Sequence, residues 1–325
     1  LPTSLALEAD RMQHLLLDET EFKKEIKVIQ EERRLRTDDN PQALTFERFL
    51  AAAHLSSPYH HPVIGWMNDI QHLTALDARR WYQRFYAPNN ATIVVVGDVQ
   101  PQAVLTQVKQ YFGPLKRQPA IERKPHIEPP ALGKKNLIIK APAQLPIMLQ
   151  GYTVPSLITT KKPETPAALE VIAGILDAGD SGRLDQHLIR GKAKASAIGV
   201  MYNPYARYQT QFIIYGMPST SGTPKQLAAL ITTELNTLKT TPVSSAELER
   251  VKTQLIAQKI FERDSVFGQA MELGLLESVG LGWQTTEQYE QRIRAVTAAQ
   301  VKDTALQYFK DTRMTEAHLL PGVAQ

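Results

Sequence analysis

Residues 25–34 read Glu25-Ile26-Lys27-Val28-Ile29-Gln30-Glu31-Glu32-Arg33-Arg34, and this stretch organises the interpretation of the chain. Glu25 and Glu32 are seven residues apart, close to two helical turns, so both carboxylates lie on one face of a helix. Val28 and Ile29 fall between them on the same broad side and would form the apolar stripe that buries the helix. Carboxylates beside apolar residues need a metal, an arginine or solvent. The simplest alternative is a solvated helix with Glu–Lys pairs at i,i+4 spacing.

Other segments accompany this one in a fixed order. They are Leu5–Met12 before it, and Asp39–Pro41, Tyr59–Trp66, Tyr86–Ala91 and Val94–Val99 after it. In this order and at these distances the segments resemble the pitrilysin/insulinase/mitochondrial processing peptidase family of zinc metallopeptidases. The resemblance is strongest over Leu5–Val99 and continues more weakly to the C-terminus. It is closest to bacterial and mitochondrial-processing-type members, which have two homologous domains per chain.

The resemblance implies a zinc site of which this sequence holds one part. In the family, an H-x-x-E-H motif supplies two histidine ligands and the catalytic glutamate, and a downstream glutamate is the third ligand. By position Glu32 matches that third ligand, and Glu25 matches an acidic residue that supports the site from outside the ligands. No pair of histidines has the spacing of H-x-x-E-H. The eight are His14, His54, His60, His61, His72, His126, His187 and His318. The chain therefore carries at most one of the three protein ligands of a catalytic zinc site.

Two explanations of the missing motif remain open. In the first, H-x-x-E-H lies upstream of Leu1, and the first domain is truncated at its N-terminus. In the second, the parent protein has a degenerate site and serves as a non-catalytic peptidase-like partner or scaffold subunit. Because Glu25 and Glu32 are both retained, we favour the first. We expect this chain alone to hold Zn²⁺ poorly and to be inactive.

The resemblance also implies an activity for the intact parent. It would be a zinc metalloendopeptidase that hydrolyses peptides or unfolded protein segments, with Zn²⁺ activating water and the motif glutamate acting as general base. Substrate would add as a strand to a sheet edge, for which the sequence identifies no residue. The partner would be an identical or homologous subunit, giving a homodimer or heterodimer.

Arg190 bears on the type of subunit. Partner-type domains of the family place a tyrosine seven residues after an arginine at the end of a helix, and the two hold substrate. Arg190 matches that arginine, but Ala197 occupies the tyrosine position and the nearest aromatic residue is Tyr202. This pattern is typical of the zinc-bearing subunit, whose partner provides the pair.

Composition limits the other classes of function. With 325 residues, 43% hydrophobic and 22% charged, the chain has room for two globular domains. A net charge of +4 without a Lys/Arg block interleaved with aromatics does not favour nucleic-acid binding. No apolar run approaches the roughly 20 residues of a membrane span. The absence of cysteine excludes disulfides and thiol nucleophiles and fits a periplasmic or cytosolic protein. We expect a periplasmic or secreted location.

Periodicity and capping residues predict an α+β chain of two homologous domains with the LuxS/processing-peptidase-like metallopeptidase fold. A proline-rich linker at Gly113–Gly133 separates residues 1–124, the later part of the zinc-bearing domain, from residues 125–325, a non-catalytic homologue. The helices expected in the first domain are Leu5–Leu17, Asp18–Thr37, Asn40–Leu55, Thr74–Tyr86 and Pro101–Phe112, with a strand at Ala91–Val96. Strands expected in the second are Asn136–Lys140, Pro146–Val154, Lys194–Tyr202, Tyr208–Met217 and Met314–Leu320.

An internal echo supports the duplication. A capped helix, an aromatic pair and an apolar strand run through Thr74–Val96 and recur, at a constant offset in the sequence, through Thr297–Leu319. Two other motifs have simpler structural interpretations. His60-His61 lies in a loop, where adjacent side chains rarely face one ion, and Gly179–Arg183 is a glycine-bounded turn before a helix.

Overall fold

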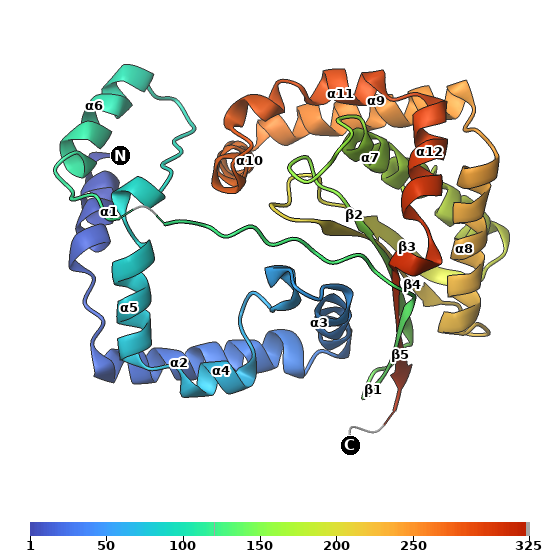
Figure 1. Ribbon diagram of the computed structural model, residues 1–325, viewed down its shortest axis with the longest axis horizontal. Coiled ribbons are helices and arrows are strands. Elements are labelled where there is room, and N and C mark those ends of the chain that lie inside the picture. The colour runs from blue at the N-terminus through green and yellow to red at the C-terminus, as the bar shows by residue number, and fades with distance from the viewer. Residues whose placement is uncertain (120, 323–325) are drawn as a thin grey trace.

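Two parts of different architecture make up the protein in the computed structural model, which describes residues 1–119 and 121–322 (Figure 1). The first part is helical, and the second is a mixed sheet with helices packed on it. Helices of the first part are α1 (Pro2–His14), α2 (Glu19–Arg33), α3 (Pro41–Ala53), α4 (Met67–His72), α5 (Ala75–Phe85) and α6 (Pro101–Phe112). None of the described helices is both long and apolar enough to cross a bilayer.

The second part contains a five-stranded sheet in the order β1-β5-β2-β4-β3. Its strands are β1 (Lys135–Ala141), β2 (Ile147–Val154), β3 (Ala195–Met201), β4 (Thr210–Pro218) and β5 (Met314–Pro321). The helices are α7 (Thr165–Leu176), α8 (Pro224–Thr240), α9 (Ser245–Phe261), α10 (Val266–Val279), α11 (Tyr289–Ala295) and α12 (Ala298–Tyr308). Only β1 and β5 pair in parallel, and the other neighbours are antiparallel. The predicted α+β class is confirmed.

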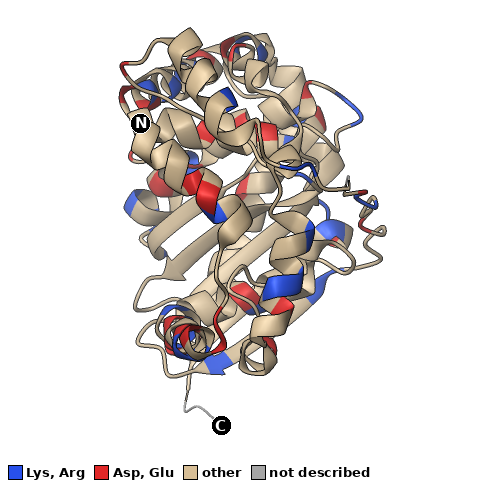
Figure 2. Ribbon diagram, turned by 90° about the vertical axis from the view of Figure 1, so that its left-hand side faces the viewer, with Lys and Arg blue, Asp and Glu red and all other residues tan. Residues whose placement is uncertain are grey.

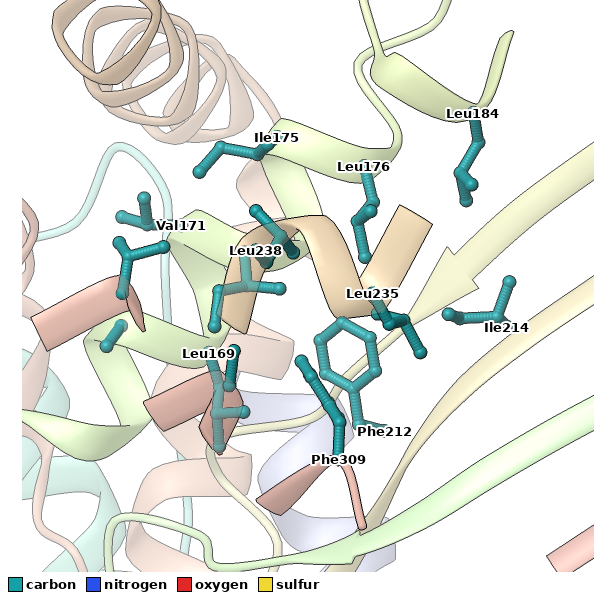
Figure 3. Close-up of a cluster of buried hydrophobic side chains, with 14 of the residues drawn as sticks. Leu169, Val171, Ile175, Leu176, Leu184, Phe212, Ile214, Leu235, Leu238 and Phe309 are labelled. Atoms are coloured by element: carbon teal, nitrogen blue, oxygen red, sulfur yellow. The ribbon is translucent and has the colours of Figure 1, made fainter. Parts of the chain in front are cut away.

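The main core lies between one face of the sheet and helices α7, α8 and α12. Figure 3 shows Phe212 from β4 and Phe309, which follows α12, among leucines and isoleucines of α7 and α8. The two rings lie 5.0 Å apart between centroids. All eight residues of β2 are buried, so both faces of this central strand are covered.

The opposite face of the sheet is covered by α3, which belongs to the helical part (Figure 1). Phe49 of α3 is fully buried among Leu149 of β2, Ile213 of β4 and Ala317 of β5. A Cβ added at Gly151 of β2 would lie 2.4 Å from Cζ of Phe49, so only glycine leaves room for the ring. The helical part and the sheet therefore share one core.

The order of elements repeats. Helices α1 to α5 correspond in order to α8 to α12, so that the N-cap Asp18 of α2 has its counterpart in Ser244 of α9. We call the helical part the first repeat and the part that contains the sheet the second repeat. Thr74 and Thr297 begin α5 and α12 with the same capping box. The predicted internal echo is confirmed for its helix and the following turn.

The predicted strand at Ala91–Val96 is wrong, although its counterpart Met314–Leu319 lies in β5. A strand exists only through backbone hydrogen bonds to a neighbour. None of the described residues of the first part forms a strand that this segment can pair with. The segment instead lies beside α10, where a Cβ added at Gly274 would be 3.8 Å from Cγ2 of Val94.

Helix α10 is the counterpart of α3 but is much more exposed. Its side chains Val266, Phe267 and Met271 are 52%, 74% and 58% exposed. We name these three residues the α10 apolar face. Helix α3, which covers the sheet, and helix α10, which has an exposed apolar face, therefore occupy matching positions in the order of elements.

The predicted linker has no helix or strand in its described residues 113–119 and 121–133, but hydrogen bonds hold it at Gln118, which bonds to Asn89, and at Glu128. The Glu128 carboxylate accepts hydrogen bonds from the backbone N–H groups of Leu55, Ser56 and Ser57, just after α3. Burial opposes ionisation of Glu128, but these three donors outweigh it and hold its pKa below the ordinary value. The linker is thus fixed to the end of α3. The domain boundary at residues 124 and 125 stays a prediction.

We expect Phe49→Ala to lower the free energy of unfolding by about 3–5 kcal/mol, because the buried ring holds α3 on the sheet. Gly151→Ala should also destabilise, since its Cβ collides with the ring. Urea unfolding measures both. The control is Phe267→Ala on the exposed α10 apolar face, where the loss should be far smaller. Equal losses at positions 49 and 267 would contradict the shared core.

His54, which follows α3, generates a pH dependence. The side chain is 3% exposed, and burial lowers its pKa to about 4. Between about pH 4 and 6.5 His54 is protonated in the unfolded chain but neutral in the folded protein, so protons favour the unfolded state. Stability is therefore present above pH 6.5 and lost as the pH falls, by about 3 kcal/mol at most. His54→Gln should flatten this slope in unfolding measurements between pH 7 and 4, and an unchanged slope would show that His54 is not responsible.

Candidate functional site

Helix α2 carries both predicted site carboxylates. Its N-cap Asp18 accepts hydrogen bonds from the N–H groups of Thr20 and Glu21 at 2.8 and 3.1 Å, so the predicted start is confirmed. The reciprocal bond of a capping box is not formed among the described residues; Glu21 instead pairs with Lys24. After Arg33 the helix widens into a π-helical turn, Arg34–Asp38.

Arg33 fixes the orientation of α2. Its side chain is buried and makes two hydrogen bonds to the Glu47 carboxylate of α3, one of them 3.0 Å long. It also donates to the carbonyl oxygen of Gly65 at 2.9 Å and pairs with Asp38 at 3.1 Å. A two-pronged arginine–carboxylate pair has strict geometry. It therefore locks the rotation of α2 against α3 and sets the direction in which Glu32 points.

Glu32, the predicted zinc ligand, borders a shallow depression beside Phe46 and Pro62. Its side chain is 41% exposed and forms an ion pair with Arg36 at 3.0 Å. Glu25, the predicted supporting carboxylate, is exposed on the same helix. The neighbouring Glu31 is 71% exposed and pairs with Arg34 instead.

The apolar residues between the two carboxylates are less buried than expected. Val28 is 57% exposed, so the prediction that it lies in a buried stripe is wrong, and Ile29 is only half-buried. None of the described elements packs over this side of α2 to cover Val28. The face that holds Glu25 and Glu32 is open.

The described residues bring no metal centre together. Among residues 1–119 and 121–322, no group of three or more histidine, aspartate or glutamate side chains is placed to hold a metal ion. The rings of His60 and His61 contact each other at an angle of 42°, and their ring nitrogens bond to the Ser57 carbonyl and the Trp66 indole, respectively. One carboxylate, Glu32, does not fit the three-ligand requirement of a catalytic zinc.

The second repeat contains positions that correspond to Glu25 and Glu32, and they lie on α9. The caps Asp18 and Asn40 are one position further apart than their counterparts Ser244 and Ser265, and the π-helical turn after α2 accommodates the additional residue. The offset between Asp18 and Ser244 therefore holds up to Arg33 and makes Gln258 the counterpart of Glu32. By the same offset Val251 is the counterpart of Glu25.

Helix α7 lies against both counterparts. Glu170, Ala173 and Gly174 of α7 line one cavity together with Gln258 of α9. A Cβ added at Gly174 would lie 2.7 Å from Cγ1 of Val251. The α7 positions have the i, i+3, i+4 spacing of H-x-x-E-H, which places all three on one helical face. Sequence reasoning missed this correspondence because none of the three residues is histidine.

The other candidates have structural roles. Arg190 forms ion pairs with Asp180 and with Asp185, the latter at 2.9 Å, which ties the turn at Gly179–Arg183 to the segment that follows it. Ala197 is exposed on β3, and the Tyr202 hydroxyl donates to the Pro155 carbonyl at 2.7 Å. Arg190 is therefore engaged by two aspartates, and the matching tyrosine position is an exposed alanine.

Acidic and basic residues are interspersed along the ribbon in Figure 2. Over residues 72–255 the sequence matches the family described as "Peptidase M16 inactive domain". The chain belongs to the M16 peptidase family. The predicted family resemblance is therefore confirmed.

Several relatives of this family are named zinc proteases. The zinc protease PqqE of Helicobacter pylori is 31% identical over 326 residues, covering 99% of this chain and 72% of the relative. An uncharacterized zinc protease of Rickettsia bellii is 25% identical and covers 95% of this chain and 72% of its own length.

Solved structures agree on the fold. A protease from Helicobacter pylori superposes with a TM-score of 0.91 at 30% identity, covering 98% of this chain and 77% of that one. An M16 inactive domain from Pseudomonas fluorescens has a TM-score of 0.83 at 18% identity, with 99% and 75% covered, and shares the fold.

We expect Glu47→Gln to destabilise the protein by about 3 kcal/mol, because it leaves the buried Arg33 charge without its anion. Chemical unfolding measures the loss. The matched control is Glu31→Gln, which removes an exposed partner of Arg34 and should have no measurable effect. If the two variants unfolded alike, the Arg33–Glu47 pair would not be what holds α2 in place.

Proposed function

We propose that this chain acts as part of a zinc metalloendopeptidase, to which α2 contributes the zinc ligand Glu32 and the supporting carboxylate Glu25. The observation that carries the proposal is the arrangement in the second repeat. There, α7 carries three residues with the spacing of H-x-x-E-H on one face, and this face lies against the counterparts of Glu32 and Glu25 on α9. The first part of this chain has no described helix that corresponds to α7.

The arrangement also supports a separate role for each carboxylate. The first and second motif positions on α7 are Glu170 and Ala173, in the cavity with Gln258, and the last is Gly174, against Val251. A helix equivalent to α7, placed against α2, would bring ligand side chains to Glu32 and one of them close to Glu25. Glu32 would then complete the ligand set, while Glu25 would accept a hydrogen bond from a ligating histidine.

Zinc in such a site supplies a polarised water for hydrolysis of a peptide bond. The residues of this chain hold the glutamate side of the site: the Arg33–Glu47 pair orients α2, and the open face leaves Glu25 and Glu32 accessible. Substrates would be peptides or unfolded segments, and the assembly would be a homodimer or a heterodimer with a homologous subunit. A periplasmic or secreted location is part of the proposal. The periplasmic protease PqqL of Escherichia coli, at 17% identity, shares only the fold.

A non-catalytic partner subunit is the second candidate, favoured by the match to the inactive-domain description. The coding sequence upstream of Leu1 decides between the two. An H-x-x-E-H motif there supports the peptidase, and a full-length first domain without the motif supports the partner.

In the longer protein we expect Glu32→Gln to abolish peptidase activity mainly by loss of zinc, because an anionic ligand is removed from a dication. Glu25→Gln should cost less, about 10–100-fold in metal affinity or rate, since an acceptor oxygen remains. Glu31→Gln is the control and should behave as wild type, because Glu31 lies about 100° round the helix. Zinc content and peptide hydrolysis measure all three. Loss of zinc in Glu31→Gln with zinc kept in Glu32→Gln would overturn the assignment.

For the 325-residue chain alone we expect no stoichiometric zinc after dialysis and no chelator-sensitive hydrolysis of peptides. Metal analysis and a peptidase assay test this directly. Zinc retained at one ion per chain would show that the described residues form a site that their arrangement does not suggest.

A further inference from the structure

A cavity of about 340 Å³ lies in the second repeat, between α7, the end of β3 and α9. It is the cavity that Gln258 and the H-x-x-E-H-spaced face of α7 share. Its volume is at the lower end of the range for ligand sites. The space suits one side chain or the end of a peptide rather than a nucleotide or a large cofactor.

Glu170 is the carboxyl group of this cavity without a paired cation among the described residues, since the charges of Arg292 and Lys259 act on it only from beyond ion-pair distance. It forms no ion pair or hydrogen bond with the described residues, and burial raises its pKa to about 7. The other acidic groups are engaged. Asp177 accepts a hydrogen bond from the Val200 N–H at 2.9 Å, and Glu262 pairs with Lys259 at 3.1 Å. Lys259 is also held by Glu272 outside the cavity lining, at 2.8 Å.

Two tyrosine hydroxyl groups in the same lining are also free. Tyr289 is 7% exposed, and its hydroxyl makes no hydrogen bond with residues 1–119 or 121–322. The hydroxyl of Tyr205 is buried and likewise has no partner among them. An unsatisfied polar atom inside a protein is costly, so the buried Tyr205 hydroxyl indicates a missing hydrogen-bond partner.

The residues that line the cavity limit the chemical classes of ligand that it can bind. A metal ion is disfavoured because the described residues provide no group of three suitable ligands here. An anion would be repelled by Glu170, and an apolar group would leave the hydroxyls unsatisfied. A primary ammonium group has one positive charge and three N–H donors, and it is attracted to tyrosine faces. Lys259 already shows this preference, with Nζ 5.7 Å from the ring centroid of Tyr289.

We propose that this cavity binds a primary ammonium group, from a lysine side chain or a peptide amino terminus. Glu170 is the counter-ion, and the hydroxyl oxygens of Tyr205 and Tyr289 accept the remaining hydrogen bonds. The non-catalytic repeat thereby has a recognition site of its own, at the place that matches the proposed zinc site. The proposal goes beyond the peptidase activity and holds for the chain whether or not that activity exists.

Calorimetric titration of the 325-residue chain tests the proposal with three probes in low-salt buffer just above neutral pH, where Glu170 is mostly ionised and a peptide amino group is still mostly protonated. Nα-acetyl-lysine methylamide carries only a side-chain ammonium, trialanine amide carries only an amino-terminal ammonium, and acetyl-trialanine amide carries neither. We expect at least one of the first two to bind at millimolar concentration and the third not to bind. Binding of the first alone identifies a lysine side chain as the ligand, and binding of the second alone identifies an amino terminus.

Variants locate the binding. Glu170→Gln should weaken it about tenfold or more, because a charge-assisted hydrogen bond is lost without a change of shape. Tyr289→Phe, which removes one hydroxyl, should weaken it a few-fold. Glu249→Gln, an exposed change on α9, should leave it unchanged. A melting curve confirms that each variant is folded. The proposal is overturned if neither ammonium probe binds, if the acetylated peptide binds equally well, or if Glu170→Gln binds like the wild type.

Discussion

Burial of β2 on both faces is the constraint on which the rest of the architecture depends. One face is covered by α7, α8 and α12, and the other by α3 through the contact of Phe49 with Gly151. Helix α3 also carries Glu47, which holds Arg33 of α2. The position of Glu32 therefore follows from the sheet by a short series of contacts: β2 fixes α3, and α3 fixes α2. The candidate site is attached to the core of the second repeat rather than to a core of its own.

Local signals in the sequence were sufficient for most elements. The N-caps Asp18, Asn40, Thr74 and Thr297 each begin a helix as predicted, because a side-chain oxygen that accepts from the first turn acts through neighbouring residues only. Non-local features were harder to predict. Ala91–Val96 has the composition of a strand, but pairing requires a neighbour that composition does not reveal.

The candidate site likewise has features that could be predicted from local sequence and features that depend on non-local packing. The helical register that puts Glu25 and Glu32 on one face followed from their spacing, while the environment of that face did not. Val28 is open because burial depends on what packs over it. The role of α7 was beyond the sequence, since Glu170, Ala173 and Gly174 have the spacing of a metal motif without its residue types. The helix–helix contact of α7 with α9 in the second part therefore forms a cavity lined by tyrosines, and no metal motif in the sequence marks it.

The exposed apolar face of α10 has a practical consequence for handling the protein. The α10 apolar face exposes valine, phenylalanine and methionine side chains on neighbouring turns. Contiguous apolar surface of this kind promotes self-association in water. Sulfate and phosphate strengthen that attraction, since they are excluded from protein surfaces. The colloidal stability of the chain therefore depends on the choice of buffer salt, and a polar residue in place of Phe267 is the simplest way to improve its solubility without touching the core.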